Sequence, residues 1–468
     1  MNYFSFMYLG FFSLILFVLS FFNIIYSYYF NLYLNLDSYV YSLIISLIFS
    51  SFLLFKKKNS FKISIYNKIL TVILGYFILP IIISIPFYFS IYNISFLDSY
   101  FESISGFTST GFTVFSNIKH LDESLILWRS SSQWIGGLYF LFSIILLIDI
   151  FDNNSKKSLT NFSSFNTSEV FKQSFKIFIL YSVLTFLIFL IFNFFDFRTF
   201  VAFNLSMSLI SSGGFLPVNE LSTIITDQSK EIILSFLMLV SFFSIFLSYN
   251  LIFFKKKNIN FFQEDLYLFF YFISLLIISY FLFSFEYDFS VILLSVTSSI
   301  SNIGISLEKS PSNLSIIFLI LVIIGGSFFS TSSGIRFLRI YALFKFSLND
   351  LISLARPKNI PINKHYFLDI SFKKNDANKY FLSILIFFIS LILLSSFLTM
   401  SGIDLESSFK LSILTLMNTV NSSMYGLNGF NFQELHFFSK FYLIFFMIIG
   451  RVELLSLLII FKKFLSKS

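Results

Sequence analysis

The sequence contains no cysteine and only three histidines, and these absences exclude several classes of site. Without cysteine there can be no disulfide framework, thiolate metal site or cysteine nucleophile. The three histidines, His120, His365 and His436, are widely separated, which argues against a histidine metal cluster. Charged residues are also scarce: they make up 12% of the 468 residues, whereas 56% are hydrophobic. This balance is typical of an integral membrane protein rather than a soluble enzyme.

Apolar runs long enough to cross a bilayer, which takes about 20 residues at the helical rise, recur along the whole chain. Ten such runs lie near residues 4–26, 39–55, 67–91, 128–151, 174–195, 231–254, 265–285, 314–345, 378–400 and 437–461. The first is longer than a signal-peptide core and has no small-residue cleavage site nearby, so it predicts a retained span. The sequence therefore predicts an all-α polytopic membrane protein.

The basic residues predict how these spans are oriented. They cluster on the side shared by both termini, at Lys56–Lys58, Lys156, Lys157, Lys255–Lys257, the loop 346–379, and Lys462, Lys463 and Lys467. The opposite loops carry mainly acidic residues: Asp98, Glu102, Asp122, Glu123 and Asp404. By the positive-inside rule, both termini are expected in the cytoplasm. The net charge of +8 is thus explained by topological anchoring, with an anionic-lipid site as the alternative, and does not indicate a nucleic-acid partner.

Four segments rich in Ser, Thr and Gly recur at matching positions between the spans. They read FESISGFTSTGFTVF (101–115), SMSLISSGGFL (206–216), SSISNIGISL (298–307) and MNTVNSSMYGLNGF (417–430). Each follows one span, ends a semi-apolar run of helical length and lies on the outer side. Recurrence in a fixed order predicts an internal repeat, and an even number of spans between segments makes the repeats parallel.

The predicted fold is therefore four span–pore loop–span repeats around a central pore, preceded by two N-terminal spans. The expected boundaries are 1–60 for the N-terminal two-span extension and 61–158, 159–260, 261–365 and 366–468 for pore repeats 1 to 4. The third repeat also holds the run 314–345, which is too long for one straight span and rich in small and hydroxyl residues. Such a composition predicts an unwound or bent segment. It is not a phosphate-binding loop, because the required Lys and following Ser or Thr are missing.

Four converging loops favour a cation pathway. Backbone outside a helix is tolerated at membrane depth only where it is buried or lines water. Half-helices that enter from outside point their negative ends at the centre, and glycine lets the preceding carbonyls turn inward, as in potassium-channel filters. The predicted ion-binding residues are Ser109, Thr110, Gly111, Ser212, Gly213, Gly214, Asn302, Ile303, Gly304, Met424, Tyr425 and Gly426. The alternative, close helix packing through small residues, explains one such segment more readily than four.

The chain resembles the TrkH/KtrB superfamily of potassium uptake proteins from about residue 65 to its end. The resemblance rests on five segments in family order: FESISGFTSTGFTVF (101–115), LWRSSSQWIGGLYF (127–140), GGSFFSTSSGIRFLRI (325–340), ARPKNIPI (355–362) and IIGRVELLSLL (448–458). Two extra leading spans suggest the TrkH branch. The chain departs from the family pattern at Ile305, where Pro is frequent, in the fourth loop, and in the central break FFSTSSGIR.

The resemblance implies potassium uptake across a bacterial inner membrane, with K⁺ as the transported ion and no cofactor bound by this chain. It also implies a homodimer in membrane lipid and a cytosolic nucleotide-binding regulatory subunit. In plant relatives Ser at the first filter position goes with sodium permeation, so Gly111 favours potassium. A symporter coupled to H⁺ or Na⁺ is the alternative, which the lack of a titratable residue in the four loops weakens. A membrane enzyme would have to use Asp98, Glu102 and His120.

By the same resemblance, the break in the third repeat is an intramembrane loop that obstructs the pore, with a kinked, closely packed helix as the alternative. The residues predicted to form this gate are Gly325, Gly326, Ser327, Ser330, Thr331, Ser332, Ser333, Gly334 and Arg451. Arg451 lies near mid-depth, where a charge costs roughly 2.5–3.5 kcal/mol, so it should face the bundle interior or water. We expect it to bind free carbonyls of the loop; pairing with Glu453 is the alternative. Arg129 is expected to be an outer-interface anchor rather than a pore residue, and Trp134 to pack on the first pore helix.

Overall fold

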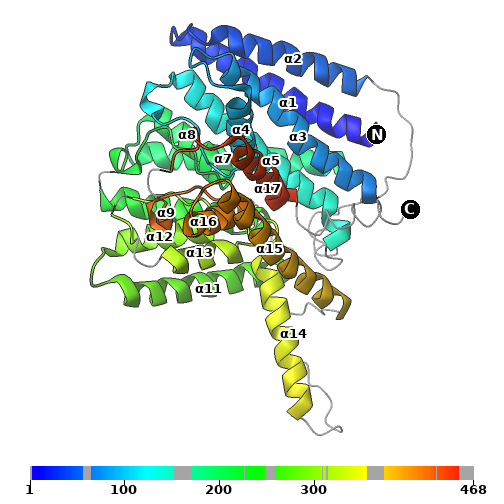
Figure 1. Ribbon diagram of the computed structural model, residues 1–468, viewed down its shortest axis with the longest axis vertical. Coiled ribbons are helices and arrows are strands. Elements are labelled where there is room, and N and C mark those ends of the chain that lie inside the picture. Colours follow the sequence, from blue (N-terminus) through cyan, green and yellow to red (C-terminus); the bar gives the residue numbers. More distant parts are fainter. Residues whose placement is uncertain are drawn as a thin grey trace.

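The computed structural model describes residues 3–55, 65–151, 170–225, 227–248, 259–307, 309–311, 315–355, 374–427 and 430–452, and all its regular elements are helical (Figure 1). Seven helices contain a stretch long and apolar enough to cross a membrane. They are α1 (Tyr3–Tyr29), α2 (Leu36–Leu54), α3 (Ile65–Tyr88), α5 (Glu123–Phe151), α7 (Val170–Phe194), α11 (Ile259–Phe283) and α15 (Lys374–Met400). The predicted all-α polytopic membrane fold is confirmed.

Helices α1 and α2 form an antiparallel pair that packs against α3. Their interface uses small polar side chains: Ser13 Oγ donates to the Ser46 carbonyl at 2.8 Å, and the Ser20 and Ser42 hydroxyls lie 3.1 Å apart. Such contacts are the usual means of association between helices in lipid, where apolar burial alone gives little driving force. The pair is joined to the rest of the molecule by Asn23, whose amide donates to the Ser124 carbonyl of α5.

The remainder of the chain repeats one arrangement four times: a long helix, a helix of twelve residues, and a second helix. The twelve-residue helices are α4 (Phe96–Phe107), α8 (Thr199–Ile210), α12 (Phe289–Ile300) and α16 (Leu405–Leu416). The helices that follow them are α5, α9 (Gln228–Phe242), α13 (Ser315–Ile324) and α17, described as Phe437–Val452. Polar side chains begin two of the short helices, since Ser95 and Asp404 accept hydrogen bonds from the N–H groups of Asp98 and Ser407.

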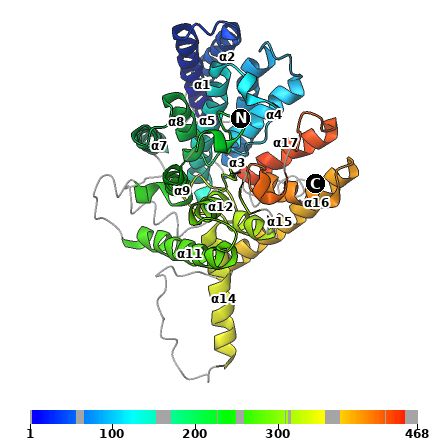
Figure 2. The same ribbon diagram turned by 90° about the vertical axis from the view of Figure 1, so that its left-hand side faces the viewer.

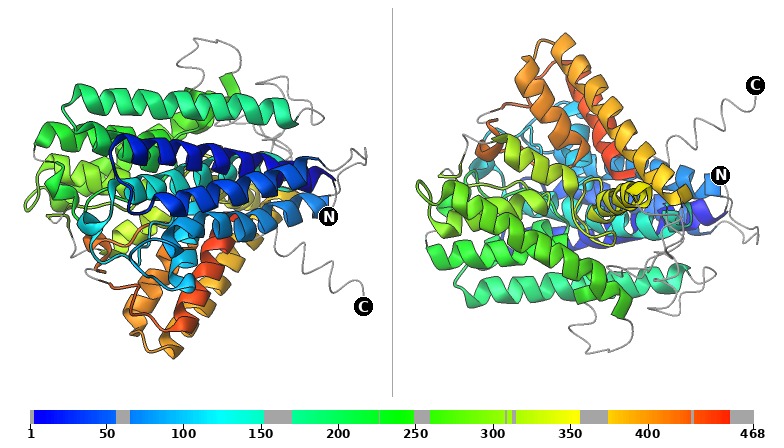
Figure 3. Two further views of the ribbon diagram at one scale, coloured as in Figure 1. Left: turned by 90° about the horizontal axis from the view of Figure 1, so that it is seen from above. Right: turned by 90° about the horizontal axis from the view of Figure 1, so that it is seen from below.

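These eight helices close into a ring. Helix α4 packs against α5, α5 against α8, α8 against α9, α9 against α12, α12 against α13, α13 against α16, α16 against α17, and α17 again against α4. Figure 2 shows them arranged around a common centre, and Figure 3 shows α1, α2 and α7 outside it with their axes roughly aligned. Helix α14 (Phe337–Ala355) instead projects away from the bundle (Figures 1 and 2).

Two of the predicted spans are interrupted. The run 314–345 divides into α13 and α14, with residues 325–336 outside a long helix between them, as the small and hydroxyl residues predicted. The run 231–254, predicted as one span, is broken because α9 ends at Phe242. The chain bends at Phe243 and Ser244, where the Ser244 N–H donates to the Asp265 carboxylate at 3.0 Å instead of to a carbonyl of its own helix.

Candidate ion-binding site

All four twelve-residue helices end in the same turn. The second residue beyond each helix has a left-handed φ: 55° at Ser109, 56° at Ser212, 59° at Asn302 and 48° at Asn418. The N–H of the next residue donates to the carbonyl two residues before the last helical one: Thr110 to Ser105, Gly213 to Ser208, Ile303 to Ser298, and Thr419 to Leu414, at 2.8–3.1 Å. This is the Schellman pattern of helix termination. It turns the chain out of the helix at the same point in each repeat.

The residues one step beyond these turns meet at the centre of the ring of helices. They are Gly111, Gly214, Gly304 and Val420, which we call the central ring. A Cβ added to Gly111 would lie 3.0 Å from Gly214 Cα and 3.1 Å from Val420 Cβ. A Cβ added to Gly304 would lie 2.6 Å from the Val420 carbonyl oxygen. Backbone from four separate repeats therefore approaches closely at one place.

Three of the four predicted triplets reach the central ring, and the fourth does not. Met424 and Tyr425 are buried in a short 3₁₀ helix, Ser423–Tyr425, behind the ring. Gly426 is exposed, and a Cβ added there would meet only the Lys410 ammonium. The place of this triplet is taken by residues 418–420. The fourth triplet was chosen for its glycine, whereas the fourth turn has Val420 at the matching position, four residues beyond the helix end.

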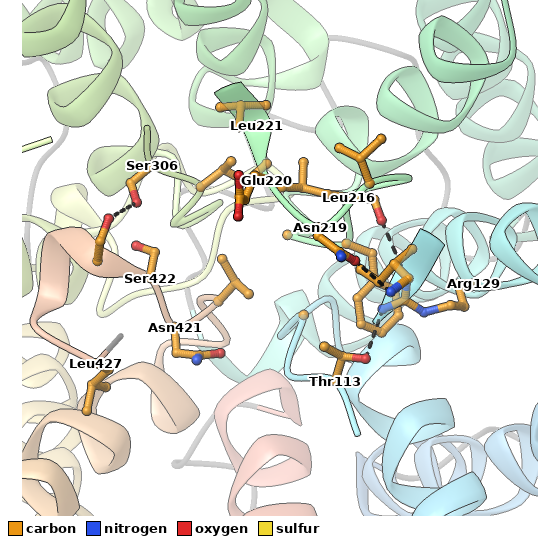
Figure 4. Close-up of a pocket in the computed structure, with 18 residues that line it drawn as sticks. Thr113, Arg129, Leu216, Asn219, Glu220, Leu221, Ser306, Asn421, Ser422 and Leu427 are labelled. Carbon is orange, nitrogen blue, oxygen red and sulfur yellow. Dashed lines mark hydrogen bonds between the residues drawn. The ribbon is translucent and has the colours of Figure 1, made fainter. Parts of the chain in front are cut away.

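A cavity of about 530 Å³ opens from the central ring on the side where the short helices begin, and residues of all four loops line it (Figure 4). Gly111, Gly214 and Val420 of the ring contribute to its wall. Six of the other lining residues are neutral and polar: Thr113, Asn219, Ser306, Asn421, Ser422 and Ser423. Seven more are apolar, and Arg129 lines one wall. Glu220, four residues beyond the second predicted segment, adds an exposed carboxylate that the sequence interpretation missed. Hydroxyl, amide and carboxylate oxygens suit a partly hydrated cation.

Arg129 fixes two of these loops from behind. Its Nε lies 2.8 Å from Glu102 Oε1, and both side chains are at most 1% exposed. Its other nitrogens donate to Thr113 Oγ1 at 3.0 Å and to the Leu216 carbonyl at 3.5 Å, so the first and second loops share one guanidinium. The Glu102 carboxylate in turn accepts from the Val114 N–H at 2.9 Å. Arg129 is thus a buried clamp and not the interface anchor that its position beside Trp128 suggested.

The acid/base set considered for a membrane enzyme does not assemble. Glu102 is held by Arg129, and the Asp98 carboxylate pairs with the Lys440 ammonium of α17 at 2.5 Å. His120 is exposed on a separate 3₁₀ turn. Within the described residues, no three or more His, Asp or Glu side chains gather as metal ligands would. The central ring offers backbone carbonyls and hydroxyls instead.

Residues 325–336, here called the intramembrane loop, lie against the inner ends of the short helices. The Thr331 hydroxyl donates to the carbonyl of Ile210, the last residue of α8, at 2.8 Å. The Ser333 hydroxyl lies 3.4 Å from the Asn418 amide oxygen in the fourth turn. Arg451 donates from Nη1 to the Thr331 carbonyl at 2.8 Å and from Nε to the Thr108 carbonyl beside the first turn. The loop therefore touches, directly or through Arg451, the turns of three repeats.

Arg336 holds the loop in shape. Its Nη1 donates to the carbonyls of Ser327 and Ser332 at 2.9 and 2.8 Å and to the Ser330 hydroxyl at 3.2 Å. Arg336 lies within the segment GGSFFSTSSGIRFLRI, and no role was predicted for it from the sequence. The available signal was the same as for Arg451, because a guanidinium in an apolar run needs carbonyl or carboxylate partners.

Glycine is required at the two ends of the intramembrane loop, here called its neck. Gly325 and Gly334 have φ of 71° and 91°, a region that disfavours residues with a Cβ. A Cβ added to Gly325 would lie 2.2 Å from the Ser333 carbonyl oxygen, and one added to Gly334 would lie 2.5 Å from Gly325 Cα. The two ends of the loop are therefore in direct backbone contact.

The loop also docks on the bend that follows α9. The N–H groups of Ser327 and Ser332 donate to the carbonyls of Phe242 and Ser241, and the Ile245 N–H donates to the Phe329 carbonyl, at 3.0–3.2 Å. The Phe328 N–H is satisfied by the Glu264 carboxylate at 2.8 Å. These bonds give the non-helical backbone the partners it needs inside a membrane.

Comparison with known proteins agrees with this geometry. Residues 305–468 match the family model described as TrkH: Cation transport protein. The chain is 26% identical to an uncharacterized cation transporter, MJ1485, of Methanocaldococcus jannaschii, over 72% of this chain and 71% of that protein. It is 24% identical to the Trk system potassium uptake protein TrkG of Escherichia coli over 88% of both chains.

The fold agrees as well. The crystal structure of the potassium transporter TrkH from Vibrio parahaemolyticus matches with a TM-score of 0.83 over 98% of both chains, at 20% sequence identity. The chain is similar to Trk-system potassium uptake proteins over most of its length. Its relatives are named as transporters and not as enzymes, which confirms that part of the sequence interpretation. Among the segments that carried the resemblance, 101–115 and 325–336 lie at the centre of the ring of helices, whereas 356–362 and 453–458 lie outside the described residues.

Proposed function

We propose that the protein carries K⁺ across a bacterial inner membrane through a channel-like pathway along the axis of the central ring. The observation that carries this proposal is the meeting of four identical helix-terminating turns below one polar cavity. The relatives named as potassium uptake proteins support potassium as the cargo.

The selectivity filter of this pathway is the backbone of residues 109–111, 212–214, 302–304 and 418–420. The C-terminal ends of α4, α8, α12 and α16 lead into these turns, so each brings the negative end of a helix dipole toward the centre. Carbonyl oxygens of the turns replace part of the hydration shell of the ion, as in other potassium filters. Coordination of the ion by these carbonyl oxygens does not require a charged side chain.

The intramembrane loop is the gate. It contacts the inner side of the turns through Thr331, Ser333 and Arg451, where it obstructs an ion that has passed the central ring. The Arg451 guanidinium also repels cations waiting there. Opening requires the loop to leave the turns, which breaks the hydrogen bonds made by Thr331, Ser333 and Arg451.

The surroundings of the pathway follow the family resemblance. We propose a homodimer with both termini in the cytoplasm and a cytosolic nucleotide-binding subunit that controls the loop. The four pore units are the repeats expected from the sequence, each contributing one turn to the ring.

A K⁺ symporter driven by H⁺ or Na⁺ is the alternative mechanism. The central ring consists of three glycines and a valine, and the preceding residues of the four turns are Ser, Thr, Asn, Gly and Ile. None of these side chains titrates in the physiological range, which favours a channel over proton coupling.

Rubidium flux into proteoliposomes that contain the full-length protein separates these mechanisms. A channel passes rubidium down its own gradient without any other ion gradient and stops at equilibrium. Accumulation against the rubidium gradient, driven by an imposed Na⁺ or H⁺ gradient, would overturn the channel mechanism. Protein-free vesicles set the background.

A further inference from the structure

The central ring is not four-fold symmetric in its backbone. Gly111 and Gly304, in the first and third repeats, have φ of 84° and 79°. Gly214 and Val420, in the second and fourth repeats, do not have positive φ. A β-branched residue is strongly disfavoured at positive φ. Valine is therefore compatible with the backbone at position 420, whereas it would be strained at 111 or 304.

The side chain of Val420 occupies the space that Gly214 leaves. A Cβ added to Gly214 would lie 2.4 Å from Val420 Cβ and 2.7 Å from its Cγ1, distances at which atoms clash. A Cβ added to Gly111 would lie 3.1 Å from Val420 Cβ. Val420 is half-buried, and it lines the polar cavity together with these two glycines. Its isopropyl group thus packs over bare backbone at the entrance to the central ring.

We propose that Val420 is a specificity-determining residue of the pathway, an inference that rests on the proposed function. An ion that enters from the cavity meets the Val420 isopropyl group beside the bare backbone of Gly111 and Gly214. Apolar groups cannot replace the oxygens of a hydration shell. The number of coordinating carbonyl dipoles is one of the quantities on which discrimination between K⁺ and Na⁺ depends. Val420 therefore narrows the entrance, slows the passage of K⁺ and lowers its preference over Na⁺, compared with a ring of four glycines.

The Val420→Gly variant of the full-length protein tests this role in proteoliposomes. We expect the K⁺/Na⁺ permeability ratio, taken from reversal potentials, to rise roughly threefold, together with a higher rubidium flux per inserted molecule. Val420→Ile keeps an apolar β-branched side chain and should leave the ratio at or below that of the parent. An unchanged or lower ratio in Val420→Gly would overturn the proposal. If the parent protein passes neither ion, the proposed function fails as well, so the two failures are distinguishable.

A second pair of variants tests the packing between positions 214 and 420. Gly214→Ala alone should reduce flux strongly, because its Cβ would meet Val420. Adding Val420→Gly to Gly214→Ala removes the two shortest contacts, leaving the added Cβ 2.9 Å from the Ile303 carbonyl oxygen, and should restore part of the flux lost in Gly214→Ala. Failure of the double variant to recover, at equal amounts of inserted protein, would contradict the proposed contact.

Discussion

Serine and asparagine occupy the left-handed position of the four turns, where helix ends more often have glycine. Asn302 and Asn418 compensate with side-chain hydrogen bonds: Asn302 donates to the Val322 carbonyl at 2.8 Å, and Asn418 donates to the Met447 carbonyl at 2.9 Å and to Thr110 Oγ1 at 3.0 Å. Short polar side chains tolerate this conformation better than others. The Ser212 hydroxyl donates to the Ser301 carbonyl, so these side chains fix the second, third and fourth turns to their surroundings.

Gly111→Ser should raise the permeability of Na⁺ relative to K⁺. The added side chain is strained at φ 84° and would lie about 3 Å from Gly214 and Val420, so it displaces one quarter of the ring. Reversal potentials with both cations measure the ratio. Gly402→Ser is the matched control, because Gly402 has φ of 96° but no atom within 4 Å of an added Cβ. An unchanged ratio in Gly111→Ser would remove this residue from the filter.

Arg451→Ala should increase rubidium flux. The substitution removes the hydrogen bonds to the Thr331 and Thr108 carbonyls and also a charge that repels cations. Arg451→Lys should be intermediate, since it keeps the charge and loses the planar fork. The measurement is flux per correctly inserted molecule.

The competing role for Arg451 is structural pairing with an acid such as Glu453, which lies outside the described residues. On that account Arg451→Ala strands a buried carboxylate and lowers the yield of folded protein. A flux per molecule that falls or stays level would contradict the gating role.

At the scale of elements, the intramembrane loop can be shortened without opening its neck. Gly325 and Gly334 are already in backbone contact, so deleting Gly326–Ser333 demands little movement of α13 and α14. Basal flux should rise, and dependence on a regulatory subunit should fall. Thr331→Val, which removes only the bond to the Ile210 carbonyl, should have a smaller effect in the same direction. An inserted, folded deletion variant that conducts no better than the parent would show that the loop is not an obstruction.

The clamp between α4 and α5 predicts a stability difference. Glu102→Gln leaves the Arg129 guanidinium buried without its carboxylate, which should cost about 3–5 kcal/mol. The control is Glu123→Gln, which breaks the pair with Arg198, a side chain that is 70% exposed. Such exposed pairs contribute about 0–1 kcal/mol. Thermal unfolding in detergent compares the two variants, and equal losses would contradict the clamp.

Some structural elements could be predicted from the sequence, and others could not. The unwound segment in the third repeat was predictable because its small and hydroxyl residues are contiguous. The bend after α9 was not, since it depends on Asp265 in α11 and on Phe329 in the intramembrane loop, both far away in the chain. Val420 was missed for a different reason. Glycine marked three turns, but the backbone of the fourth does not need it.

At the scale of the whole molecule, hydropathy and repetition predicted the architecture. Apolar length fixes where spans can lie, and the order span, short helix, turn, span recurs too regularly to be accidental. The closed contact sequence from α4 through α17 and back to α4 follows from four parallel repeats in one chain. Which side chains meet at its centre depends on contacts between repeats, and these have no local signature in the sequence.

The most direct test of the central claim is to locate rubidium in the protein by anomalous X-ray diffraction from crystals grown in rubidium. The account predicts a peak on the axis of the central ring, enclosed by residues 109–111, 212–214, 302–304 and 418–420. Crystals of Gly111→Ser should show a weaker peak at the same place, and crystals grown in sodium should show none. Rubidium sites only elsewhere, in a protein whose flux is intact, would contradict a filter built from these four turns.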